Sequence, residues 1–117
     1  MSVSYSDFKD YSDGIGKGSP EFLKRNAISR GYYAEFHIVR EKFKNHPRSE
    51  FKNGGGDHQN CVKILGIIGN RDLKQDFIQL KEARKKADYD IDDTVSNFML
   101  DVFQSDLDEF MLKIESK

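Results

Sequence analysis

Apolar residues recur three and four positions apart along most of this chain, the spacing of helices that pack on one side. Leu73, Phe77, Leu80 and Ala87 give the clearest case. No segment alternates apolar and polar residues over the length of a strand, and the 117 residues contain only two prolines. The pattern predicts a single all-α domain over residues 1–117, a bundle of four long helices with a short N-terminal helix.

Breaks in this pattern place the ends of the expected helices. Ser19 and Pro20 suit the first turn of the second helix, and His46-Pro47 ends it. Asp57 and Asn70 are the expected N-caps of the third and fourth helices. The helices are then expected at about 6–16, 20–45, 57–69, 70–89 and 95–114.

The composition narrows the classes of function. Nineteen basic and twenty acidic residues give a net charge of −1, so bulk charge does not indicate nucleic-acid binding, although a local basic patch can still serve it. Cys61 is the single cysteine, which indicates a reducing compartment. Three scattered histidines offer no zinc-ligand spacing, so no metal or other cofactor is expected. No leader or membrane-spanning run is recognisable, so we expect a cytoplasmic protein without membrane contact.

Two polar sets interrupt otherwise apolar helix faces. Arg30, Tyr33 and His37 fall on one line of the second helix, because seven residues make almost two turns. Arg84 stands between Leu80 and Ala87 on the apolar stripe of the fourth helix, the seam along which it packs, and Asp88 lies one turn away. Either these groups hydrogen-bond and pair with one another in a buried structural network, or they form a binding or catalytic site. We expect them, together with Tyr89, to form one cluster between the two helices.

Two segments resemble one family of small prokaryotic proteins. Residues 26–37 read NAISRGYYAEFH, similar to the SRAYYAxFH signature of HEPN proteins, and residues 80–89 read LKEARKKADY, similar to the LxxxRxxADY signature of one branch. His58, after Gly56-Asp57, is similar to a His often found at the start of the next helix in that branch. Gly31 stands where the family usually has Ala, which suggests a close approach by a neighbour.

The resemblance implies a HEPN-like helical bundle that often dimerises and is often paired with a small nucleotidyltransferase. Many HEPN proteins are metal-independent ribonucleases that act as toxins or in antiviral defence, with an Arg followed four to six residues later by His. Here Arg84 matches that Arg, and Tyr89 stands at the His position. A phenol titrates near 10, so it is a weaker base at neutral pH than an imidazole. His37 or His58 is the candidate substitute base.

Three functions are therefore open. The first is a toxin-like or defence protein that binds RNA or a nucleotide at an Arg/His/Tyr cleft and cleaves RNA. Its catalytic candidates are Arg84, Tyr89 and His37, and its binding candidates are Arg30, Tyr33, Asp88 and His58. The second is a non-catalytic dimeric HEPN module that binds a nucleotidyltransferase. The third is a structural helical adaptor. We expect a homodimer through the Met/Phe stripe of the last helix or the seam of the fourth.

Overall fold

The computed structural model describes residues 4–16, 18–49, 51, 57–68 and 71–117, and within these ranges it contains five helices and no strand. The all-α prediction is confirmed. In chain order the helices are α1 (Tyr5–Gly14), α2 (Glu21–Phe43), α3 (Asp57–Ile67), α4 (Arg71–Tyr89) and α5 (Asn97–Glu115). No helix in the described part of the chain is long and apolar enough to cross a bilayer.

The observed helix ends differ slightly from the expected ones. Pro20, and not Ser19, is the N-cap of α2, which begins at Glu21 and ends at Phe43. α5 begins later than expected because the Ser96 side chain accepts a hydrogen bond from the Met99 amide and so caps the helix. α3, with 11 residues, is close in length to the 10-residue α1. The expected boundary at 69–70 lies outside the described residues.

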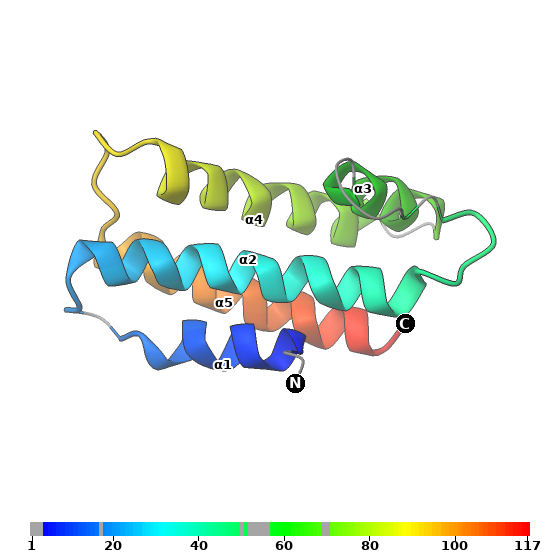
Figure 1. Cartoon of the computed structure of the whole chain (residues 1–117), viewed down its shortest axis with the longest axis horizontal. Helices are drawn as coiled ribbons and strands as arrows, with labels where there is room; N and C mark the ends of the chain where they lie inside the picture. Colours follow the sequence, from blue (N-terminus) through cyan, green and yellow to red (C-terminus); the bar gives the residue numbers. More distant parts are fainter. Residues whose placement is uncertain (1–3, 17, 50, 52–56, 69–70) are drawn as a thin grey trace.

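Helix α2 is the central element of the bundle and contacts each of the other four helices. In Figure 1, α2 (cyan) crosses the middle of the molecule, with α3 and α4 on one side of it and α1 on the other. α5 (orange to red) runs alongside α2 and packs on both α2 and α4. This position explains the unusually wide apolar face of the α2 sequence, because neighbours cover it from several directions.

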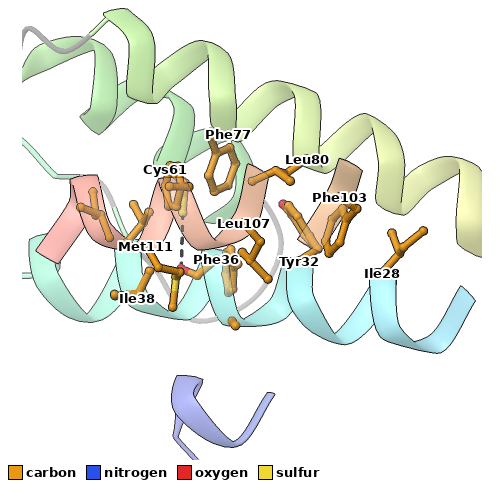
Figure 2. Packing of buried hydrophobic residues seen from close by; sticks show 14 of the residues in the cluster. Ile28, Tyr32, Phe36, Ile38, Cys61, Phe77, Leu80, Phe103, Leu107 and Met111 are labelled. Atoms are coloured by element: carbon orange, nitrogen blue, oxygen red, sulfur yellow. Dashed lines mark hydrogen bonds between the residues drawn. The ribbon is translucent and has the colours of Figure 1, made fainter. Parts of the chain in front are cut away.

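The core is one cluster of buried side chains from α2, α3, α4 and α5. Tyr32, Phe77 and Phe110 are its largest fully buried members. Figure 2 shows Phe77 and Leu80 of α4 facing Leu107 of α5, above the α2 side chains. The Cys61 thiol is also buried, and it donates to the Phe36 carbonyl oxygen at 3.9 Å.

Arg25 of α2 connects this helix to the end of α4 and to the segment that follows it. Its guanidinium donates to the Ala87 carbonyl at 2.9 Å and to the Asp90 carbonyl at 3.2 Å. These carbonyls lie at the C-terminal end of α4, where a cation offsets the unpaired acceptors and the helix dipole. Arg25 is therefore a structural residue that fixes the connection between α4 and α5.

Gly31 lies where α2 packs closest to α5 and α1. A Cβ atom placed there would lie 2.6 Å from the Phe103 Cε1, 2.9 Å from the Leu107 Cδ2 and 2.9 Å from the Ser12 Oγ. The Ser12 hydroxyl itself donates to the Ala27 carbonyl at 2.7 Å and cannot move away freely. The close approach expected at this glycine is present.

Gly31→Ala is therefore expected to lower the free energy of unfolding by about 1–3 kcal/mol, the usual cost of overpacking. Gly66→Ala on α3 is the matched control, because its Cβ would meet only Lys74 side-chain atoms at ordinary contact distances of 3.6 Å and beyond. Gly66→Ala should raise the free energy of unfolding by about 0.5–1 kcal/mol, because Ala has a higher helix propensity than Gly. Urea unfolding gives the free energy of unfolding of both variants. Equal changes in the two would contradict a close contact of Gly31 with α5 and α1.

Candidate functional site

Tyr33, on α2, lies at the centre of the polar residues that the sequence singled out. Its ring centroid is 5.7 Å from the Arg30 Cζ and 6.0 Å from the Arg84 Cζ. On its other side it is 6.3 Å from the His37 ring. Arg30, Tyr33 and His37 therefore follow one another along one line of α2, and Arg84 of α4 contacts this line at Tyr33.

Arg84 is held between aromatic rings and one carboxylate. Its Cζ lies 5.7 Å from the Tyr32 ring centroid and 5.4 Å from that of Tyr89. Its Nε forms an ion pair with the Asp88 Oδ2 at 2.9 Å. Burial works against the charge, but Tyr33, Tyr89 and Asp88 favour it more strongly, and together they raise the pKa of Arg84 above its usual value. The guanidinium is therefore a fixed positive charge with aromatic walls.

The surroundings of Arg84 are open to solvent on one side. Tyr89 is 66% exposed, and Arg30 is also exposed. Ser29 contacts the Asp88 Oδ2 at 3.4 Å, from the turn of α2 that precedes Tyr33. We call Arg30, Tyr33, Arg84, Asp88 and Tyr89 the Arg84 cluster. It combines two guanidinium groups with two aromatic rings, and Asp88 is the member whose carboxylate pairs with Arg84.

His58 lies beneath this cluster and is held by Tyr32. The Tyr32 hydroxyl is 2.5 Å from the His58 Nδ1, and the two rings are stacked at 5.5 Å. Burial, and then the nearby Glu35, raise the pKa of the Tyr32 phenol far above its ordinary value. The phenol therefore stays protonated, and it shares this hydrogen bond with the His58 Nδ1, in which either atom can be the donor, depending on the tautomer of the imidazole. His58 also stacks on Phe36 at 4.4 Å.

His37 is covered by α1, a neighbour that the sequence did not indicate. The ring of Phe8 stacks on it at 5.5 Å with an interplanar angle of 13°. Burial and the charge of Arg40 lower the pKa of His37, so the imidazole is neutral at pH 7. His37 and His58 both contact the Phe36 ring, at 5.0 and 4.4 Å, but His37 faces Phe8 of α1, whereas His58 belongs to α3.

A hollow of about 400 Å³ opens beside His37, between α1 and α2. Three aromatic rings and three polar side chains line it: Tyr5, Phe8, His37, Ser4, Arg40 and Glu41. Tyr33 is the member of the Arg84 cluster next to this hollow, because its ring also lies 5.9 Å from Phe8.

Glu35 is a buried carboxyl group that sequence reasoning missed. It is completely buried, and neither side-chain oxygen has a hydrogen-bond partner among the described residues. Burial, and then the charge of Asp76, raise its pKa well above 4.5, so it is expected to be protonated. A signal was available, because Glu35 follows Ile28 and Tyr32 at the spacing of the apolar stripe.

The structure thus brings Arg30, Tyr33, Arg84, Asp88 and Tyr89 together, and it links His37 and His58 to them through Tyr33 and Tyr32. Among the residues described, no three His, Cys, Asp or Glu side chains gather as metal ligands. Such an arrangement can bind a phosphate group through the guanidinium cations and can stack nucleobases on the aromatic rings.

Comparison with known proteins adds no family: no family model, no curated protein and no solved structure matches this chain. The HEPN resemblance therefore stays a prediction based on the two segments. The function that follows is argued from the geometry of the Arg84 cluster itself.

Proposed function

We propose that the Arg84 cluster binds single-stranded RNA or a nucleotide, with Arg84 and Arg30 at a phosphate group and Tyr89 stacked on a base. The single observation that supports this most is the position of the Arg84 Cζ, within 6.0 Å of the Tyr33 and Tyr89 rings. A guanidinium and an exposed ring side by side match the two parts of a nucleotide.

The exposure of Tyr89 argues against a purely structural role. A ring that only shields a buried ion pair gains most when it is itself buried, yet Tyr89 is 66% exposed. Single strands fit this surface better than duplexes, because their bases are free to stack on side chains. A net charge of −1 leaves little long-range attraction for a duplex backbone.

The proposal concerns binding and does not include cleavage. Tyr89 provides a phenol where the resemblance expects an imidazole, and the His58 Nδ1 is engaged by the Tyr32 hydroxyl. Incubation of labelled single-stranded RNA with the protein in EDTA should therefore leave the RNA intact. Cleavage that is lost in His37→Gln would instead favour a metal-independent ribonuclease with His37 as the base.

Tyr89→Ala should weaken binding of a fluorescein-labelled single-stranded RNA by about 5- to 150-fold, because one stacked base is worth about 1–3 kcal/mol. Tyr11→Ala is the matched control, since Tyr11 is a 45% exposed ring on α1. Fluorescence anisotropy at a fixed salt concentration measures both affinities. An unchanged affinity for Tyr89→Ala, or a preference for duplex RNA, would contradict the proposal.

We also propose that a second copy of the chain covers a groove between α4 and α5. Phe98 (75% exposed) and Val102 (42% exposed) line this mostly apolar groove with Leu80 and Ala83. Lys86 lies at its rim with the acidic Glu82 and Asp106, so a two-fold related copy could pair these opposite charges. A self-complementary rim around an apolar centre suits an isologous dimer.

Light scattering at micromolar concentration should give about twice the 13.5 kDa of one chain. Phe98→Lys should give the monomer mass, because it places a charge in the apolar centre of the contact. Phe22→Lys, at another exposed Phe on α2, should leave the dimer intact. A wild-type monomer throughout this concentration range is the result that excludes the dimer.

A further inference from the structure

The hollow between α1 and α2 has the size and lining of a small-ligand site. Its volume of about 400 Å³ lies in the range of ligand pockets, about 300–1,000 Å³. Tyr5, Phe8 and His37 supply ring surfaces, and Arg40 and Glu41 supply one charge of each sign. Flat ring walls with a few polar groups favour a flat heteroaromatic ligand over a flexible apolar one.

Tyr33 of the Arg84 cluster adjoins the hollow. The Tyr33 ring lies 5.9 Å from Phe8 and 6.3 Å from His37, two residues that line the hollow. The same ring lies 5.7 Å from the Arg30 Cζ and 6.0 Å from the Arg84 Cζ. A ligand that crosses Tyr33 therefore meets a ring-lined hollow on one side and two guanidinium groups on the other. The base and the phosphate of a nucleotide are separated in the same way by the ribose.

The polar groups of the hollow indicate the kind of base. The Glu41 side chain is exposed, pairs with Lys44 at 3.1 Å and can only accept hydrogen bonds when ionised. A carboxylate in this position favours bases with an exocyclic amino group, as in adenine, cytosine and guanine, over uracil. His37, neutral at pH 7, adds a ring face without adding a charge.

We infer that the α1–α2 hollow binds the base of the nucleotide whose phosphate lies at the Arg84 cluster, while Tyr89 stacks on the neighbouring base of a bound strand, and that Glu41 selects bases with an exocyclic amino group. This inference rests on the proposed function of the Arg84 cluster. It extends the site from α4 across the α2 ridge to the N-terminal helix, and it assigns roles to Glu41 and Phe8, which the sequence did not single out.

Competition against labelled single-stranded RNA tests the inference with four probes: AMP, CMP, UMP and ribose 5-phosphate. AMP and CMP should compete about tenfold better than UMP, a ratio within the range of one good base contact. Ribose 5-phosphate, which lacks the base, should compete no better than UMP. Glu41→Gln should remove the preference for AMP over UMP and leave competition by ribose 5-phosphate unchanged.

Glu109→Gln is the matched control, because Glu109 is an exposed carboxylate on α5 that also pairs with a lysine, Lys113, at 3.7 Å. It should leave every ratio unchanged, whereas Arg84→Ala should weaken all four competitors together. Equal competition by AMP, UMP and ribose 5-phosphate would overturn the base site while Arg84-dependent RNA binding still stands. If the RNA itself does not bind, the proposed function fails, and the inference fails with it.

Discussion

Replacing Glu35 with Gln is expected to remove a large pH dependence of stability. In the folded chain the Glu35 carboxyl is fully buried and its pKa is raised well above 4.5, whereas in the unfolded chain it ionises near its ordinary value. Between these two pKa values the folded state holds one more proton than the unfolded state. The wild-type free energy of unfolding should therefore fall by about 1.4 kcal/mol for each pH unit of increase.

The sign of this effect distinguishes Glu35 from an ion-paired carboxylate. A carboxylate that is ionised in the fold, with a lowered pKa, loses its stabilising effect as the pH falls. Glu35 acts in the opposite direction, because its stability cost is absent in acid and grows as the pH rises above its ordinary pKa. The neutral Gln side chain is nearly the same size and has no such proton to hold.

Urea unfolding of the wild type and Glu35→Gln at several pH values from 5 to 8 makes the comparison. The difference in free energy between the two should change in favour of the variant as the pH rises, by about 1.4 kcal/mol per pH unit until the pH reaches the folded-state pKa of Glu35. The slope is the measured quantity, because the buried Gln amide has its own desolvation cost at every pH. Parallel curves would mean that Glu35 is ionised or solvated in the fold.

Arg84→Ala is expected to separate binding from stability. The Arg84 and Asp88 side chains are 17% and 25% exposed, so Asp88 left alone can be reached by water. Loss of this partly exposed pair and of the ring contacts should cost about 1–2 kcal/mol. A fully buried network would instead lose about 3–5 kcal/mol. RNA affinity should fall more than tenfold, because the phosphate loses a charge-assisted partner.

Arg84→Lys sharpens this test. It keeps the charge but loses the planar group that stacks between the Tyr32 and Tyr89 rings. RNA affinity should fall to an intermediate value, with little change in the urea midpoint. An unfolded Arg84→Ala protein, or a folded one with wild-type RNA affinity, would make the structural adaptor the better interpretation.

Sequence periodicity predicted the helices and brought attention to polar residues on two of them, although His37, expected in the same cluster, lies against Phe8 of α1. Arg30, Tyr33 and His37 share one line of α2, and Arg84 and Asp88 share one turn of α4. Two interruptions of apolar faces were expected to meet, and Arg84 does contact Tyr33. Gly31 was also informative, because a missing side chain in a helix interior indicates a close neighbour.

What the sequence could not supply is which third element covers a given face. The periodicity that puts His37 on the ridge does not show that Phe8 of α1 will stack on it. The sequence did not single out Arg25, because its acceptors are backbone carbonyls at the end of α4, which no residue type indicates. Glu35 stands on the apolar stripe of α2, but its complete burial depends on the helices that close over that face, which the spacing does not identify.

The most direct measurement of the central claim is an NMR titration of the labelled protein with single-stranded RNA. Amide shifts should change first at Ser29, Arg30, Tyr33 and residues 84–89, and then at residues 4–8 and 37–41 on either side of the hollow. The α5 side of the groove between α4 and α5, with Phe98 and Val102, should stay unchanged. Shifts that gather at that groove, or that are absent at saturating RNA, would contradict a nucleotide site at the Arg84 cluster.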